Sequence, residues 1–278
     1  MIEIAESSFD PANSPNHTLS IRLLPDGFCF VVASLSERRP LYFCQIAEEG
    51  KSVVQQFTEQ FNKLDSLRRK YSEVSFLNDA RSYTLMPSAT FDEADMMTYW
   101  KFCTNGNPDG VRIVQDQLDF CDATLLHGVP KVIAERMAER FPSVKYLHRQ
   151  SLLVTKAMVQ NKKSGEETVG VFVGEDFFDL VVVKEGVLQM VNTFSNNNDE
   201  EFLYFTLNVL DQLKIDPYKA QFIMSGDVTE KSSVVSVFSK YVNHVQVEPK
   251  SHSGWGKAFA KSNLCQQQNI LFELPQCE

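Results

Sequence analysis

The sequence predicts an α/β protein that consists of two related halves, each with the element order βββαβ, and a small α+β insertion. Two observations predict this fold. Residues 17–78 and 168–226 both run through strand, tight turn, strand, tight turn, strand, helix and strand. The turn that begins at Leu24 matches the turn that begins at Val173, and the later elements keep nearly the same spacing. Few side chains are identical between the halves, so the prediction rests on order and spacing.

The first half follows a polar leader at residues 1–16, which we expect to be loosely held. Its strands are predicted because apolar residues alternate with polar ones or form short unbroken runs. Asp26-Gly27 follows the first strand and is typical of the left-handed backbone in a tight hairpin. The helix is predicted because apolar residues recur every three or four positions. Three strands, the helix and a fourth strand are expected at 18–24, 28–33, 41–47, 52–71 and 74–77.

Residues 83–160 have no counterpart in the second half. We therefore interpret about 83–150 as a subdomain inserted into a first half that spans 17–160. Its first helix begins at Asp92 or Glu93, because acidic residues suit the first turn of a helix, and the Asn- and Gly-rich run 105–110 ends it. Further strands are expected at 111–118, 123–127 and 144–148, further helices at 130–140 and 150–160, and a polar hairpin turn at 161–167.

The second half is assigned to residues 168–278. Its helix at 200–213 is apolar nearly all round, which predicts burial on more than one side, either between the halves or under a partner. Trp255 lies in a Gly- and Ser-containing segment that is either a flexible loop or an anchor for a partner. Strands are expected at 168–173, 177–183, 187–193, 221–224, 244–247 and 270–274, and a second helix at about 229–242.

Composition and charge narrow the classes of function. The 278 residues include 27 Lys and Arg against 36 Asp and Glu, which gives a formal charge of −9. An acidic chain repels phosphate backbones, so we expect no nucleic-acid partner. There is no signal-peptide pattern and no apolar run of membrane-spanning length, so a cytoplasmic location without a membrane span is predicted. The six cysteines and five histidines are too widely spaced for a local metal site, and no metal is predicted.

The order of elements and the turns at Leu24 and Val173 resemble the actin-like ATPase superfamily, whose fold is of the ribonuclease H-like type. The chain resembles more closely an uncharacterised bacterial family of about this length with an actin-like ATPase fold. The resemblance covers about 17–90 and 168–250 and implies that fold, but no activity. In the superfamily, phosphate loops combine an Asp for magnesium, glycines that let backbone N–H groups approach phosphate, and small hydroxyl residues.

The second half departs from this loop pattern at most positions. Phe172 stands at the position of the magnesium-directing Asp, and Phe177 and Phe178 replace the small hydroxyl residues. Glu175 and Asp176 add two negative charges where glycines would admit a phosphate. These changes predict that phosphate binding is lost.

The first half departs further from the pattern. Arg22 occupies the Asp position, and Pro25 removes a backbone donor. In the second half, the Gly-Gly pair that the superfamily places at the nucleoside is reduced to Ser225-Gly226. The architecture is therefore predicted to persist beside degenerate phosphate loops.

The sequence favours a non-catalytic protein-interaction or regulatory protein without a cofactor, acting through an unknown protein partner or as a homodimer. The alternative is a divergent ATPase or phosphotransferase that binds Mg-ATP. A third possibility is a sensor of a small molecule in the inter-domain cleft. No catalytic residue is assigned. If the alternative holds, the nucleotide-binding residues are Asp26, Gly27, Gly174, Asp176, Asp179, Ser225 and Gly226.

Overall fold

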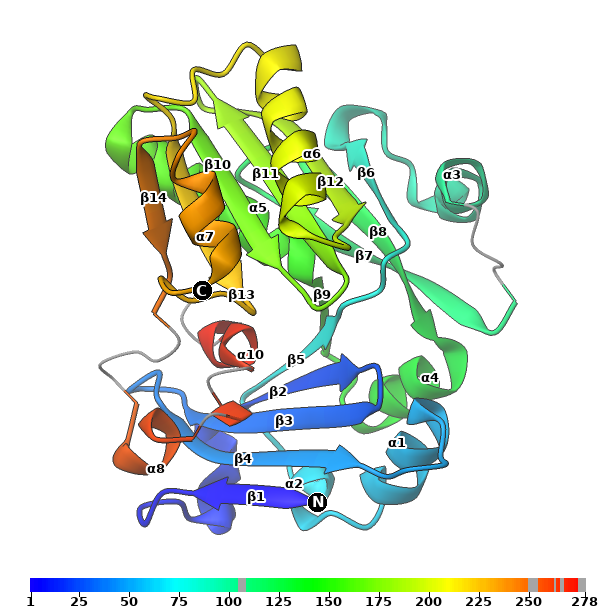
Figure 1. Ribbon diagram of the computed structural model, residues 1–278. Coiled ribbons are helices and arrows are strands. Elements are labelled where there is room, and N and C mark those ends of the chain that lie inside the picture. Colours follow the sequence, from blue (N-terminus) through cyan, green and yellow to red (C-terminus); the bar gives the residue numbers. More distant parts are fainter. Residues whose placement is uncertain (105–108, 250–254, 263, 266–267, 275–278) are drawn as a thin grey trace. The chain divides into compact units, whose positions relative to one another are not determined.

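A computed structural model describes the chain except for residues 105–108, 250–254, 263, 266–267 and 275–278 (Figure 1). The chain forms two compact units. The first unit comprises Met1–Gln117, Ala123–Arg149 and the described part of the C-terminal tail. The second unit comprises Leu118–Asp122 and Gln150–Pro249. In the described part of the chain, no helix is both long and apolar enough to cross a bilayer.

A six-stranded sheet forms the centre of the first unit, in the order β1-β4-β3-β2-β5-β9. Strands β2, β3 and β4 are antiparallel neighbours, whereas β5 runs parallel to β2 and β9 runs parallel to β5. The strands are β1 (Ile2–Ala5), β2 (His17–Leu24), β3 (Gly27–Ser34), β4 (Pro40–Ala47), β5 (Glu73–Asn78) and β9 (Lys145–His148). The leader is not loosely held, because β1 pairs with β4 and the 3₁₀ helix η1 (Pro11–Asn16) leads into β2.

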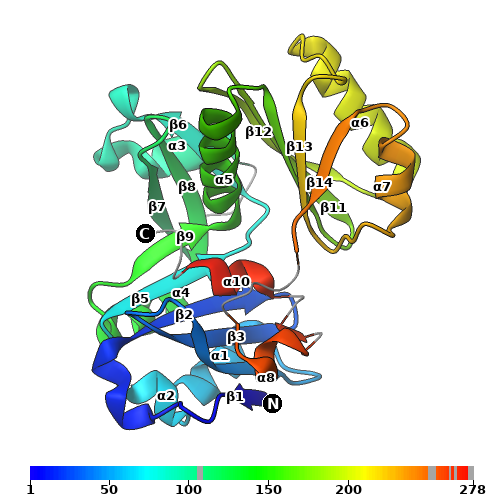
Figure 2. The same cartoon turned by 90° about the vertical axis from the view of Figure 1, so that its left-hand side faces the viewer.

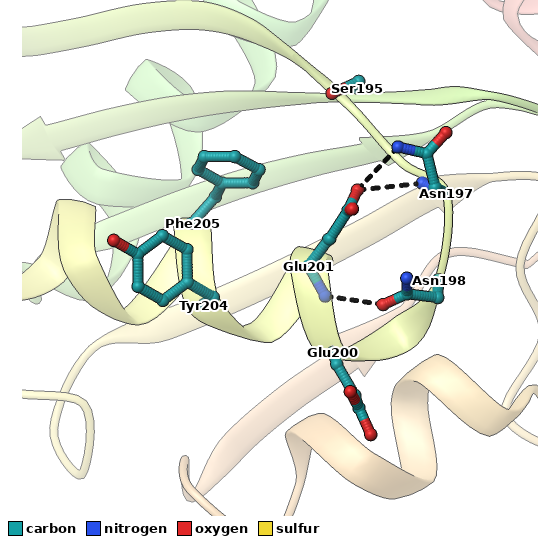
Figure 3. A pocket seen from close by; sticks show the side chains of 7 residues that line it. All are labelled: Ser195, Asn197, Asn198, Glu200, Glu201, Tyr204 and Phe205. Carbon is teal, nitrogen blue, oxygen red and sulfur yellow. Dashed lines mark hydrogen bonds between the residues drawn. The ribbon is translucent and has the colours of Figure 1, made fainter.

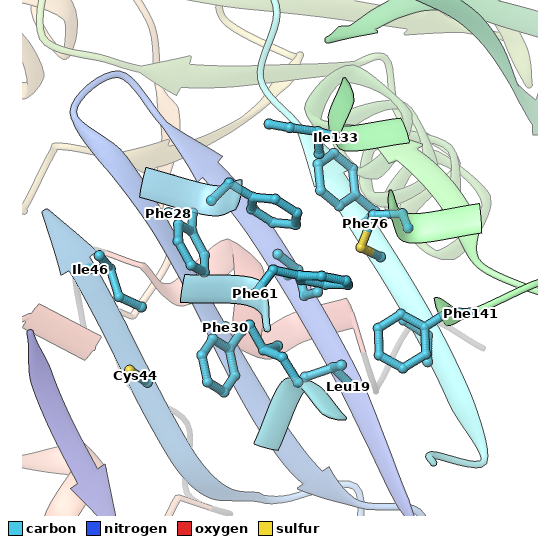
Figure 4. Packing of buried hydrophobic residues seen from close by; sticks show 14 of the residues in the cluster. Leu19, Phe28, Phe30, Cys44, Ile46, Phe61, Phe76, Ile133 and Phe141 are labelled. Atoms are coloured by element: carbon cyan, nitrogen blue, oxygen red, sulfur yellow. The ribbon is translucent and has the colours of Figure 1, made fainter. Parts of the chain in front are cut away.

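One face of this sheet packs on α1 (Val53–Phe61), α2 (Asp65–Arg68) and α4 (Lys131–Arg140). Phe28, Phe30 and Phe61 meet in the buried core that Figure 4 shows. Ser52 caps α1, because its hydroxyl accepts a hydrogen bond from the Gln55 N–H and the Ser52 N–H donates one to Gln55 Oε1. The single helix predicted over 52–71 is wrong: the backbone is extended at the N-cap of α2, and only then does α2 begin.

The insertion contains a three-stranded sheet in the order β6-β8-β7, together with helix α3 and two short 3₁₀ helices. Trp100, Ile113 and Leu126 form its small core. The helix begins later than predicted, because Asp92 caps a short 3₁₀ turn, η3 (Glu93–Asp95), before the α-helical backbone starts. The predicted stop of this helix lies partly outside the described residues. The elements are β6 (Tyr83–Pro87), η2 (Ser88–Thr90), α3 (Met96–Cys103), β7 (Val111–Leu118) and β8 (Ala123–Pro130).

The second unit has a five-stranded sheet in the order β12-β11-β10-β13-β14, with its first three strands antiparallel and the next two parallel to β10. This topology repeats that of β4-β3-β2-β5-β9 in the first unit, so the predicted βββαβ duplication is present. The β11–β12 hairpin closes through Glu185 and Gly186, which both have positive φ. The strands are β10 (Thr168–Val173), β11 (Phe177–Lys184), β12 (Val187–Ser195), β13 (Gln221–Gly226) and β14 (His244–Val247).

Helices cover both faces of the second sheet, as Figure 2 shows. Helices α6 (Asp199–Gln212) and α7 (Ser233–Phe238) contribute to the buried core on one face. Helix α5 (Arg149–Ser164) lies on the other, where a Cβ on Gly170 would lie 3.7 Å from Cβ of Ala157. Two predictions are wrong here. Helix α5 continues to Ser164, so the polar turn expected at 161–167 is confined to 165–167. Tyr204 of α6 is 67% exposed, so α6 is buried on one side.

The C-terminal tail belongs to the first unit, although the sequence assigned it to the second half. Its described helices are α8 (Lys257–Ala260) and α10 (Asn269–Glu273), so the strand predicted at 270–274 is wrong. The ring of Phe272 stacks on Phe43 and lies against Trp255, with ring centroids 5.5 and 4.6 Å apart. Trp255 is only 7% exposed, so it anchors the tail of its own chain.

Candidate functional site

The turn between β10 and β11 is closed by its own backbone. The Gly174 N–H donates a 2.9 Å hydrogen bond to the Phe177 carbonyl, and the Asn196 N–H donates to the Asp176 carbonyl at 3.0 Å. A Cβ atom on Gly174 would lie 2.4 Å from the ring of Phe177, so this ring lies directly against the glycine. A larger residue at this position would have to displace the ring of Phe177.

The turn after β13 lies next to this first turn. Strands β10 and β13 are parallel, and Val173 pairs with Gly226. Gly226 has a φ of +87°, and a Cβ there would lie 2.2 Å from the Val173 carbonyl oxygen and 3.1 Å from the ring of Phe172. The Asp227 N–H donates a 2.7 Å hydrogen bond to the Val173 carbonyl. The fold therefore brings Gly174 and Gly226 together at the carboxyl ends of two neighbouring strands.

Two phenyl rings cover these glycines. Phe172 and Phe177 are stacked with their ring centroids 6.1 Å apart. A phosphate binds such turns through backbone N–H groups that point outward from a concave nest. Here the N–H groups of Gly174 and Asp227 are bonded within the turns. As they stand, the two turns therefore offer neither the space nor these donors to a phosphate.

The other predicted site residues of the second unit are dispersed. Asp176 is exposed in the β10–β11 turn, whereas Ser225 is buried and its hydroxyl lies 3.4 Å from the Val171 carbonyl. Asp179 is fully buried inside β11, where it faces Phe172 across the ladder. The Thr193 hydroxyl donates a 2.6 Å hydrogen bond to Asp179 Oδ1. Asp179 is thus held within the sheet, away from the exposed carboxylate of Asp176.

In the first unit, Asp26 and Gly27 form a structural turn. Gln56 of α1 is buried, and its Nε2 donates a 2.8 Å hydrogen bond to the Asp26 carbonyl. The left-handed backbone predicted at Gly27 is wrong, because the glycines with positive φ do not include it. Gly27 is needed for a different reason: a Cβ there would lie 2.0 Å from the carbonyl oxygen of Ile46 on β4.

Arg22 takes the place of the magnesium-directing Asp and is engaged by an acidic partner. Its Nε donates a 2.8 Å hydrogen bond to Asp79 Oδ2, and its Nη1 donates to Gln268 Oε1 at 2.8 Å. Nη1 of Arg149, a residue with 2% exposure, lies 3.8 Å from the same Asp79 oxygen. Burial alone would raise the pKa of Asp79, but Arg22 and Arg149 hold this pKa below its usual value. Asp79 is therefore a buried carboxylate shared by two guanidinium groups.

A second polar group extends this cluster at the carboxyl ends of β5 and β9. Asn78 pairs with His148 across these parallel strands, and its amide donates hydrogen bonds to His127 Nδ1 at 3.1 Å and to the Gly128 carbonyl at 2.8 Å. His148 Nε2 donates to the Ala80 carbonyl at 2.8 Å. Burial lowers the pKa of His148 to about 4 and holds the pKa of His127 well below its ordinary value. Both rings are therefore neutral near pH 7.

Sequence reasoning missed this cluster, although a signal was present. Asn78 and Asp79 directly follow the strand predicted at 74–77, and His148 and Arg149 lie at the end of the strand predicted at 144–148. In open α/β sheets, ligands bind outside the carboxyl ends of parallel strands, so polar residues there deserve early inspection. In this protein the charges compensate one another and tie the strand ends together. In the described part of the chain, no three His, Cys, Asp or Glu side chains converge as a metal site would require.

The family model described as a protein of unknown function, DUF3822, matches residues 6–245. The chain belongs to this family. The predicted resemblance to an uncharacterised family is thereby confirmed. No curated relative matches this DUF3822 protein.

Solved structures agree on the fold of this DUF3822 protein. A Bacteroides thetaiotaomicron protein with an actin-like ATPase fold and unknown function gives a TM-score of 0.77 at 17% identity, covering 95% of this chain and 99% of that one. The PilM–PilN type IV pilus biogenesis complex gives a TM-score of 0.54 at 12% identity, covering 94% of this chain and 96% of that one. At these identities the likeness establishes the actin-like ATPase fold, as predicted, and nothing about activity.

Proposed function

We propose that this DUF3822 protein is a non-catalytic interaction or regulatory protein that retains the actin-like ATPase fold. The observation that carries the proposal is the state of the two glycine turns in the second unit. Phe177 lies against Gly174, Phe172 lies against Gly226, and the Gly174 N–H is bonded to the Phe177 carbonyl. Enzymes that transfer phosphoryl groups work mainly by positioning and charge stabilisation of the phosphates, so the loss of this cradle removes the main catalytic device.

The first unit supports the same proposal. Arg22 replaces the magnesium-directing Asp and is committed to Asp79. A magnesium ion needs hard oxygen ligands, and a guanidinium repels it. Recruiting Asp79 as a ligand would leave Arg22 and Arg149 without their shared carboxylate, which is costly for a buried ion pair. The fold can still present surfaces to a protein, and the PilM–PilN structure is a protein complex on this fold.

The alternative, a divergent Mg-ATP-binding ATPase or phosphotransferase, requires a rearrangement. Phe172 and Phe177 would have to leave the glycines before a phosphate could reach Gly174 or Gly226. Of the two acidic residues predicted for this half, Asp179 is buried and Asp176 is exposed, so Asp176 would then be the one able to meet a hydrated magnesium ion. That alternative therefore predicts binding that depends on both magnesium and Asp176.

Thermal unfolding with millimolar Mg-ATP, Mg-ADP or magnesium alone tests the proposal. We expect no nucleotide-dependent change in the midpoint. Saturation at about 100 times Kd would instead add about 2.7 kcal/mol of stability. At about 2–4 °C per kcal/mol for chains of about 150–250 residues, the midpoint would rise by about 5–11 °C. Asp176→Ala is the matched variant, because the exposed side chain can be removed without disturbing the core. A magnesium-dependent shift that Asp176→Ala abolishes would overturn the proposal in favour of the alternative.

A further inference from the structure

The edge strand β12 has little of the usual protection against pairing: a bulge at Gln189 interrupts its start, whereas Met190–Ser195 pairs regularly with β11. It ends the sheet of the second unit, with β11 as its neighbour in that sheet. Its nine residues, Val187–Ser195, include no charged residue and no proline. Natural edge strands are usually short, charged, bulged or interrupted by proline, since an open edge is a template for another strand. The uncharged and regularly paired part of this edge, Met190–Ser195, is therefore suited to accept one.

The phase of the ladder shows which backbone groups face outward. The Asn196 N–H donates to the Asp176 carbonyl, so this pair is hydrogen-bonded, and every second residue from there back to Met190 bonds toward β11. Val191, Thr193 and Ser195 are the alternate residues, and their N–H and C=O groups point away from β11. The Thr193 N–H is met by the neighbouring Asn192 Oδ1 at 2.9 Å, and this side chain can rotate away. Three residues at a spacing of two thus define a register for an added strand.

A shallow hollow of about 440 Å³ lies where β12 meets the first turns of α6 (Figure 3). The Phe205 ring stacks on Phe194 of β12 at 5.3 Å and meets Tyr204 edge-on at 5.4 Å, so aromatic side chains line one side. Asn197 donates a 2.8 Å hydrogen bond from Nδ2 to Glu201, which fixes the opposite wall. The lining residues are Ser195, Asn197, Asn198, Glu200, Glu201, Tyr204 and Phe205.

The charge of this region selects the chemistry of an occupant. From Val187 to Leu213 the chain contains no Lys, Arg or His, whereas it contains the acids Asp199, Glu200, Glu201 and Asp211. Glu200 and Tyr204 are both exposed and lie four residues apart on α6. Complementary charge speeds encounter and excludes acidic competitors, and arginine also stacks on aromatic rings.

We propose that β12 and this hollow bind an extended segment of a partner protein in which apolar residues alternate with Lys or Arg. The segment adds a sixth strand beside β12, with main-chain hydrogen bonds to Val191 and Ser195. One of its side chains enters the hollow against Phe205 and Tyr204, and a basic residue meets Glu200. The inference rests on the proposed function, because it names the kind of partner that the interaction protein takes.

Selection from a phage library of random ten-residue peptides on the intact protein tests this inference. We expect enriched peptides to alternate apolar and basic residues and to lack proline at their centre. A labelled enriched peptide should lose about tenfold or more in affinity to Tyr204→Ala and Glu200→Lys, the change expected when an interface anchor is truncated. Val191→Pro should also abolish binding, since it removes an outward N–H without breaking the ladder to β11.

Matched variants separate the site from general surface effects. Tyr218→Ala removes another exposed tyrosine of the second unit, and Glu230→Lys reverses an exposed charge before α7. Both should leave peptide affinity unchanged. The inference is overturned if no peptide is enriched, if acidic peptides are enriched, or if the enriched peptides bind all variants alike. A dimer in sedimentation that Val191→Pro dissociates would make a second copy the occupant and equally overturn it.

The failures of the two proposals can be told apart. Nucleotide binding is read by thermal unfolding, and peptide binding is read by titration of the labelled peptide. A magnesium-dependent nucleotide shift with intact peptide binding overturns the non-catalytic proposal alone. The absence of both signals overturns the peptide site alone.

Discussion

Arg22 directs two of its N–H groups to one carboxylate oxygen of Asp79, which lies just beyond the end of the neighbouring strand β5. Arg149 approaches the same oxygen from the start of α5. The three side chains are all largely buried. This one carboxylate therefore compensates two positive charges at the edge where the parallel strands end. Removing it should lower the stability of the protein by a different amount from removing either arginine.

Asp79→Asn should destabilise the protein by about 3–5 kcal/mol, the usual cost of removing one partner from a buried ion pair. Arg22→Met should cost less, because Arg149 stays beside the carboxylate. Unfolding in guanidinium chloride measures both. Asp65→Asn is the control, since its pair with Arg69 is exposed and such pairs contribute at most about 1 kcal/mol. Equal losses for Asp79→Asn and Asp65→Asn would contradict the role assigned to Asp79.

The buried histidines predict loss of stability in mild acid. His148 is neutral in the fold because burial lowers its pKa to about 4, whereas the unfolded chain binds a proton near the ordinary value of 6.5. The unfolded state therefore gains protons first, and stability falls as pH drops from about 6.5 toward 4. The slope is about 1.4 kcal/mol per pH unit for each such histidine. Urea unfolding across this range measures it.

The matching variants for this pH dependence are His148→Gln and His244→Asn. The glutamine can still donate to the Ala80 carbonyl but cannot take up a proton. It should reduce the slope by about one proton, leaving the contributions of His127 and His17, whose pKa values are also lowered by burial. His244 is exposed on β14, so its replacement should leave the slope as it is. An unchanged slope in His148→Gln would contradict the role of His148 in this pH dependence.

The duplicated βββαβ order was predictable because local turn chemistry and apolar periodicity determine it. Glu185-Gly186 has the positive φ angles that a two-residue hairpin needs, so the strands on either side of it pair as β11 and β12. The tail was mispredicted because the short apolar run 270–274 carries no period that separates strand from helix. It folds as α10, where Phe272 completes a core on the first sheet.

The candidate site was only half predictable. Phe172 and Phe177 occupy recognisable loop positions, so the loss of the phosphate cradle could be anticipated from the sequence. Their placement against Gly226 and Gly174 could not, since it depends on the parallel pairing of β10 and β13. The partner of Arg22 was missed for the same reason: Asp79 is distant in sequence and reaches Arg22 only through the pairing of β2 with β5.

Gly226→Ala should be more damaging than Gly186→Ala, although both glycines have positive φ. Alanine at Gly186 meets no atom within 4 Å and bears only the backbone strain, about 1–2 kcal/mol. At Gly226 the new Cβ would also lie 2.2 Å from the Val173 carbonyl oxygen, so β10 and β13 must move. We expect an added cost of about 1–3 kcal/mol, as for overpacking. Equal unfolding midpoints would show that the turn relaxes and that Gly226 has no structural requirement.

Phe272→Ala should destabilise the first unit by about 3–5 kcal/mol, as large-to-small changes at buried aromatic positions do. Phe272 is 1% exposed and stacks on Phe43 of β4, so the tail closes a sheet face that would otherwise be open to water. Phe102→Ala is the control, because Phe102 is 91% exposed and its loss should change stability by less than about 0.5 kcal/mol. Chemical unfolding followed by tryptophan fluorescence measures both, since Trp255 packs on Phe272. If the two variants unfold alike, the tail is peripheral and the second face of the sheet must be stabilised by other contacts.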